Sequence, residues 1–151
     1  MNGRILIADN DPPVRNGMQT LLSNAGYTAL FAVDGISLIE RARKHQPHLI
    51  MIDFCLPAGN AAVLVQTLRR FPEFTHTPIF IIAGREFRTS AVQAFDSGAD
   101  AFLPKPFNRQ VLFSLLARFL PSEPNFESTI PIENLSLRTS PPPCFSRVFY
   151  N

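Results

Sequence analysis

The sequence predicts an α/β fold, a doubly wound parallel sheet of five strands covered by five helices. Short apolar runs alternate along the chain with longer segments in which apolar residues recur every three or four positions. This alternation is typical of buried parallel strands connected by covering helices. The apolar runs themselves are nearly continuous, as expected for strands buried on both faces.

The five expected strands are the short apolar runs of the chain. The first is mostly apolar and leads directly into acidic residues, and the fourth is the most hydrophobic segment of the sequence. By residue number the strands are expected at 4–8, 27–31, 48–52, 78–82 and 99–103.

The five expected helices follow these strands, and local signals mark their ends. Asp11 can cap the first helix, whose first turn tolerates Pro12 and Pro13 because the missing N–H groups would lack intrahelical partners. Asn108 is placed to cap the last helix. The second helix starts after the Asp34-Gly35 turn, the third after Pro57, and the weaker fourth covers residues 86–97.

The chain divides into a domain over residues 1–120 and a Pro-rich tail over residues 121–151. The tail shows no sustained period of 2 or 3.6 and carries Pro121, Pro124, Pro131 and the run Pro141-Pro142-Pro143. Such a segment buries too little apolar surface to offset its ordering entropy, so we expect it to be largely disordered. Its apolar residues leave open that it docks on the domain or on a partner.

Composition narrows the function classes. The net charge of +2 in 151 residues does not indicate direct binding to nucleic acid. No apolar stretch reaches the roughly 20 residues that span a bilayer, and Asp9 and Asp11 interrupt any signal-peptide pattern. Cys55 and Cys144 have no metal-ligand spacing, so a cytoplasmic protein is expected.

Polar residues follow three of the expected strands. Asp9, Asn10 and Asp11 come after the first, Asp53 after the third and Lys105 after the fifth. Ligands of doubly wound sheets bind outside the carboxyl ends of the strands. Neighbouring carboxylates repel one another unless a cation lies among them, and oxygen ligands of this kind suit Mg²⁺. The sequence therefore predicts an acidic, Mg²⁺-binding site.

Each of these residues also has a purely structural interpretation. An acidic residue after a strand is often only a helix cap, which leaves Asp11 with two interpretations. For Lys105 the structural interpretation is a solvated loop lysine, but its place between Pro104 and Pro106 would aim the side chain and favours a functional role. Asp53 precedes Phe54-Cys55-Leu56 and has no helix directly after it to cap, which favours a functional role.

Over residues 3 to about 120 the chain resembles the response-regulator receiver domains of two-component signalling. The matching motifs are Ile-Leu-Ile-Ala-Asp9, Pro47-His-Leu-Ile-Met-Ile-Asp53 with Leu56-Pro57, and Gly98-Ala-Asp-Ala-Phe-Leu-Pro-Lys105-Pro106-Phe107. They occur in the family's order and spacing: 44 residues separate Asp9 from Asp53, and 52 separate Asp53 from Lys105.

The resemblance implies a phosphorelay function and a strand order of 2-1-3-4-5. Asp53 would accept a phosphoryl group from a histidine kinase or phosphotransfer protein, and Lys105 would contact that group. Mg²⁺ would be held by Asp9, Asn10 and Asp53, with Asp11 nearby. The Lys105–Pro106 peptide bond would be cis. Signalling would use the surface of the fourth helix, fifth strand and fifth helix, for a downstream partner or for self-dimerisation.

Three positions depart from the family pattern, and a fourth modifies it. Ala61 occupies the position where the acceptor loop of the family usually has a glycine, with Gly59 nearby. Asn10 replaces the second acid of the first pair and contributes an uncharged amide oxygen. Ala83 occupies the switch position where the family has Thr or Ser, so the hydroxyl is lost. Phe102 keeps the switch aromatic but has no hydroxyl.

These departures leave two alternatives to phosphorylation-dependent signalling. One is a pseudo-receiver, a module of the same fold whose interactions do not depend on phosphate. The other is an enzyme, since Asp9-Asn10-Asp11 also resembles the Asp-x-Asp motif of haloacid-dehalogenase-type phosphatases. That family needs further acids after a late strand, and here the late strands end in Ala83-Gly84 and Leu103-Pro104, with no acid. We therefore expect a signalling protein without enzymatic activity.

Overall fold

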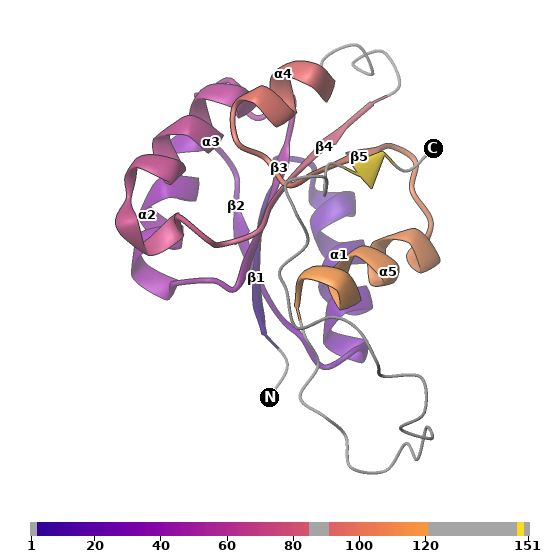
Figure 1. Ribbon diagram of the computed structural model, residues 1–151. Coiled ribbons are helices and arrows are strands. Elements are labelled where there is room, and N and C mark those ends of the chain that lie inside the picture. The colour runs from indigo at the N-terminus through magenta and orange to yellow at the C-terminus, as the bar shows by residue number, and fades with distance from the viewer. Residues whose placement is uncertain (1–2, 85–90, 121–147, 150–151) are drawn as a thin grey trace, which may run out of the picture.

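A central parallel sheet with helices on both faces forms the body of the molecule in the computed structural model (Figure 1). The structure describes residues 3–84, 91–120 and 148–149. Five strands run in the order β2-β1-β3-β4-β5, with every neighbouring pair parallel. The predicted fold class and strand order are confirmed.

The strands are short, and the central ones are the most apolar. Every residue of β3 and β4 is buried, which explains their continuous hydrophobic sequences. The strands are β1 (Arg4–Ala8), β2 (Thr28–Ala32), β3 (Leu49–Asp53), β4 (Ile79–Ala83) and β5 (Ala101–Pro104).

The helices begin where the sequence provides capping groups. Asp34 and Ser37 form a capping box at the start of α2, and the Asn108 side chain accepts a hydrogen bond from the N–H of Val111 at the start of α5. The described helices are α1 (Pro12–Asn24), α2 (Gly35–His45), α3 (Ala61–Arg70), a 3₁₀ turn η1 (Pro72–Phe74), α4 (Ala91–Asp96) and α5 (Arg109–Phe119).

Two apolar clusters lie on opposite faces of the sheet. One, which we call the α2–α4 core, packs α2, α3 and α4 against one face. The other, the α1–α5 core, packs α1 and α5 against the opposite face. Successive strand residues alternate between them: Ile81 belongs to the α2–α4 core and Ile82 to the α1–α5 core.

Several predicted boundaries shift by one or two residues. The second strand is Thr28–Ala32 rather than 27–31, and the fifth is Ala101–Pro104 rather than 99–103. The fourth helix is described only over Ala91–Asp96, because residues 85–90 lie outside the described residues. Backbone hydrogen bonds determine the first and last residues of a strand or helix, and a pattern of apolar residues does not show where those bonds end.

A sixth strand extends the predicted five-stranded sheet. β6 (Val148–Phe149) pairs in parallel with β5, from within the tail expected to be disordered. Two residues are too few to show a period, so the sequence pattern did not reveal this strand. The expectation of disorder otherwise concerns residues 121–147 and 150–151, outside the described part of the chain. No helix among the described residues is long and apolar enough to cross a membrane.

Candidate functional site

Asp9 and Asp53 lie side by side at the carboxyl edge of the sheet. β1 and β3 are parallel neighbours, so the residues that end them meet at the same edge. The N–H of Asp9 donates to the carbonyl of Ala32 at 3.0 Å, which continues the β1–β2 ladder and fixes its backbone. Asp9 is 1% exposed and Asp53 is 8% exposed. The sheet thus buries two carboxylates next to each other.

Lys105 joins these two carboxylates. It follows β5, and its N–H donates to the carbonyl of Ala83 at 2.7 Å. Its Nζ lies 3.3 Å from Asp9 Oδ2 and 3.3 Å from Asp53 Oδ1. The Lys105–Pro106 bond is cis, as the resemblance implied. Two carboxylates and one ammonium give this partly buried cluster a formal net charge of −1.

Burial and charge act against each other in this cluster. Burial raises the pKa of Asp53, and the repulsion of Asp9 adds to that rise, while the positive charge of Lys105 offsets part of it. Burial acts to lower the pKa of Lys105, but the carboxylates of Asp53 and Asp9 outweigh it and raise that pKa. Lys105 therefore stays charged at neutral pH and acts as a fixed cation.

Asp11 is not part of this cluster in the described conformation. Its side chain is exposed and makes no capping hydrogen bond, although it occupies the N-cap position of α1. Its backbone N–H donates to Asp9 Oδ1 at 2.9 Å, which orients the Asp9 carboxylate. The expectation that Asp11 caps α1 through its side chain is therefore wrong, whereas its role as a metal ligand beside Asp9 and Asp53 stays a prediction.

Arg15 is a site neighbour that the sequence analysis did not identify. Its Nη1 donates to the backbone carbonyl of Asp9 at 3.0 Å, from the first turn of α1. The bond ties the start of α1 to the residue that carries the buried carboxylate. The only signal in the sequence is an arginine one helical turn after Asp11.

The residues present fit a hard divalent cation. Asp9 and Asp53 provide carboxylate oxygens with excess negative charge, and the exposed Asn10 adds an amide oxygen at the same strand end. Among the described residues, however, no group of three or more acidic, His or Cys side chains is arranged for a metal. The donor set is thus suited to Mg²⁺ but has less negative charge than three carboxylates would give.

The two predicted switch positions are both buried. Ala83 ends β4 and is fully buried, and its methyl group offers no hydrogen bond to a phosphoryl oxygen. Phe102 is 2% exposed and packs into the α2–α4 core. Neither position supplies a hydroxyl to the site.

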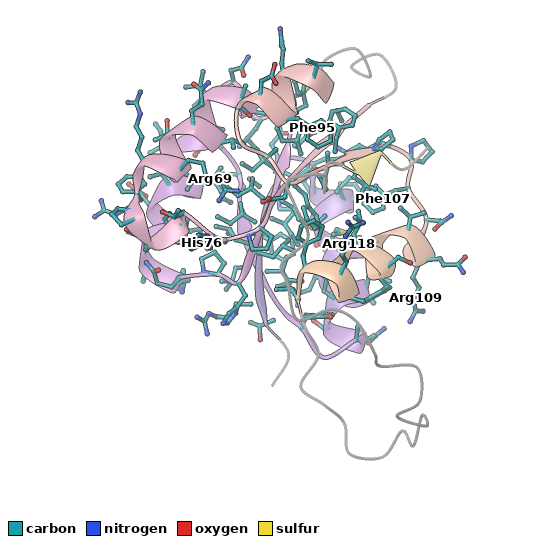
Figure 2. The ribbon with its side chains drawn as sticks, viewed as in Figure 1. Arg69, His76, Phe95, Phe107, Arg109 and Arg118 are labelled. Atoms are coloured by element: carbon teal, nitrogen blue, oxygen red, sulfur yellow. The ribbon has the colours of Figure 1, made fainter. Side chains whose placement is uncertain are left out.

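An apolar recess lies beside Lys105. It has a volume of about 350 Å³ and lies between the first half of α1 and the segment after β5. Figure 2 labels Phe107, which contributes to its wall. The other lining residues are Pro13, Val14, Gly17, Met18, Lys105 and Pro106.

Comparison with known proteins agrees with this geometry. The family model described as "Response regulator receiver domain" matches residues 5–117. The chain belongs to this family. The receiver domain is 36% identical over 117 residues to a DNA-binding dual master transcriptional regulator, RpaA, of Synechocystis sp.; the match covers 78% of this chain and 48% of the relative. The chain spans about half the length of the curated relatives it matches.

Solved receiver domains have the same architecture. The chemotaxis response regulator CheY4 of Vibrio cholerae is 26% identical, with a TM-score of 0.74 over 80% of this chain and 100% of CheY4. The receiver domain of sensor histidine kinase PA1611 of Pseudomonas aeruginosa, 22% identical with a TM-score of 0.72 over 79% of this chain and 98% of that one, shows the shared fold. That structure has a magnesium ion coordinated in its active site cleft.

Proposed function

We propose that this receiver domain accepts a phosphoryl group on Asp53 and signals through protein–protein contact. One observation carries the proposal: Lys105 Nζ lies 3.3 Å from both Asp9 and Asp53, at the carboxyl edge of the sheet. Phosphoryl transfer needs an in-line nucleophile, a metal cation on the phosphoryl oxygens and a fixed positive charge. Asp53 supplies the nucleophile, and Lys105 supplies the fixed positive charge.

Mg²⁺ would supply the remaining charge. Asp9, Asp53 and the amide of Asn10 would hold it, and it would neutralise the phosphoryl oxygens during transfer. Asp9 is oriented for this by the backbone N–H of Asp11, and its own backbone is held by Arg15. Lys105 would then shift from the two carboxylates to a phosphoryl oxygen, a charge-assisted contact.

The donor would be a histidine kinase or phosphotransfer protein. The apolar recess of α1 and the segment after β5 borders Lys105, so a protein docked there reaches the acidic cluster directly. Because six of the seven residues that line the recess are uncharged and Lys105 is its one cation, we infer that it binds the donor protein rather than nucleic acid.

Labelling with a small phosphodonor in Mg²⁺ tests the acceptor. Intact-mass analysis should show one added phosphoryl group in the wild type and none in Asp53→Asn. Asp96→Asn, which changes an exposed carboxylate at the end of α4, is the matched control and should label normally. Label that persists in Asp53→Asn would contradict the assignment.

Gly17→Leu tests the docking recess separately. A Cβ at Gly17 meets nothing within 4 Å, so there is space for a side chain at this position in the lining of the recess. Transfer from a phosphohistidine-bearing protein should slow at least tenfold, whereas labelling by the small phosphodonor should be unchanged. Equal slowing with both donors would show that the recess acts on the chemistry and not on docking.

The second candidate function is a phosphate-independent interaction module of the same fold. Asn10 and the buried methyl group of Ala83 favour it, since one weakens the cation site and the other removes a phosphoryl contact. Absence of labelling in the wild type, with Mg²⁺ in excess, would favour this module over the acceptor.

A further inference from the structure

β6 changes which strand forms the edge of the sheet. Val148 pairs with Ala101 and Phe149 with Phe102, both in parallel register. Figure 1 shows β6 beside β5, on the side of the sheet that α4 and α5 flank. Without β6, the outer backbone groups of β5 would have no strand beside them.

β5 lacks the usual protection of an edge strand. Exposed edges add strands from other molecules unless charged residues, prolines or a covering segment prevent it. Ala101, Phe102 and Leu103 are uncharged and buried, and Pro104 comes only at the strand's end. Lys105 forms ion pairs with Asp9 and Asp53, so its charge does not protect the edge of β5.

The chain has the length and the residues to cover this edge itself. The 28 residues numbered 120–147 separate α5 from β6. At up to ~3.3 Å per residue they reach about 90 Å, more than the return path of a parallel crossover requires. Val and Phe are among the residues that best fit a strand.

We propose that β6 is a built-in cover for β5, an intramolecular strand that prevents a second copy of the chain from pairing there. The occupant is the chain's own Val148–Phe149, and release of this strand would open β5 to edge-to-edge association. The proposal concerns the sheet edge alone and does not depend on phosphorylation of Asp53.

Paired cysteines test the register in the full chain, with Cys55 and Cys144 both changed to Ser. Register partners on neighbouring strands project to the same face, whereas residues one position out of register project to opposite faces. Ala101→Cys with Val148→Cys should form a disulfide under mild oxidation. Phe102→Cys with Val148→Cys is the control and should form it at least tenfold more slowly.

Non-reducing mass analysis separates the outcomes. A disulfide within one chain of the Ala101→Cys, Val148→Cys variant supports the proposal. Disulfide-linked dimers alone would show that a second copy supplies the strand. Equal rates of disulfide formation in the two cysteine pairs would show that β6 does not pair with β5 in this register. Either of these results overturns the proposal.

A proline variant gives a second, independent test. Proline has no N–H and disrupts strand pairing, so Phe149→Pro should release the cover, whereas Phe149→Val should keep it. We expect faster amide exchange within Ala101–Leu103 and a larger weight-average mass by light scattering for Phe149→Pro only. Exchange and mass equal to those of Phe149→Val would contradict the proposal.

Discussion

Asn10 sets the charge of the cation site. It stands between Asp9, which is buried, and Asp11, whose side chain is exposed and outside the cluster. At an effective dielectric near 20, one unit charge a few Å away changes the energy of a divalent ion by several kcal/mol before solvation compensates. The amide should therefore weaken Mg²⁺ binding.

We expect Asn10→Asp to bind Mg²⁺ about tenfold more tightly than the wild type and to label Asp53 faster. The measurement is a calorimetric or NMR titration with Mg²⁺, and Asp11→Ala is the companion variant. If Asp11→Ala alone abolishes wild-type binding, Asp11 has moved in as the metal ligand. No binding in any of the three proteins would refute the cation site.

Asp53 makes stability depend on pH in an unusual direction. Its pKa is raised in the folded chain, mainly by burial, so the folded state holds the proton more tightly than the unfolded state. Stability from this group is therefore lost as the pH rises from the unfolded pKa of 3.8 through the folded pKa.

Asp53→Asn should accordingly raise the free energy of unfolding at pH 7 relative to the wild type. This difference in the free energy of unfolding should shrink as the pH falls through the folded-state pKa of Asp53 toward 3.8, and it should stay constant at lower pH. Urea unfolding at several pH values measures it, with Asp96→Asn as control. A wild type that is more stable than Asp53→Asn at pH 7 would show that attraction to Lys105 outweighs burial.

The residues of the site differ in how far the sequence could predict them. Asp9, Asp53 and Lys105 each follow an apolar strand, and the sheet brings such strand ends together, so their meeting was predictable. The position of Asp11 was not, because one residue decides whether a side chain faces the site or the solvent. Arg15 was missed because its partner is a backbone carbonyl, which leaves no trace in side-chain patterns.

At the scale of elements, Arg69 on α3 connects three neighbouring segments. Its guanidinium donates to the carbonyls of Phe74, Thr77 and Gly98 and to the carboxylate of Asp100. Figure 2 labels Arg69 on this helix. Asp100 also accepts the N–H of Ile79 at the start of β4. The arginine thus fixes the end of α4 and the starts of β4 and β5 relative to α3.

Arg69→Met should destabilise the domain by about 2–3 kcal/mol, because charge-assisted hydrogen bonds are lost and carbonyl groups lose a partner. Amide exchange should rise most around Gly98. Arg70→Met, at the exposed neighbouring position, is the control and should change stability little. If both variants lose the same free energy of unfolding, the hydrogen bonds of the Arg69 guanidinium do not stabilise the domain.

Helix starts were more predictable than strand ends or short strands. Asn108 caps α5 as expected, and the Asp34 side chain accepts the N–H of Ser37 at 2.7 Å. These signals are local, so the sequence contains them. β6 and the Arg69 network depend on partners many residues away, and a single sequence shows no pattern for them.

At the scale of the whole molecule, the described residues of both cores end at Leu120. Every described member of the α2–α4 core and the α1–α5 core lies at or before that residue. A chain ending at Leu120 should therefore unfold cooperatively, with a midpoint within about 4 °C of the full chain, or about 1 kcal/mol for this size. Calorimetry measures this, and a larger fall would show that the tail packs on a core.

The separation of the two cores lets neighbouring residues mutate independently. Ile81 and Ile82 are adjacent in β4 yet pack into different cores, so Ile81→Val and Ile82→Val should each cost about 0.5–1.5 kcal/mol and add within about 0.5 kcal/mol. Ile52 and Ile81 are register partners in one core, so their double variant should deviate from additivity. Evolution can thus rebuild one layer of this domain while the other, and the strands that carry the acidic cluster, stay as they are.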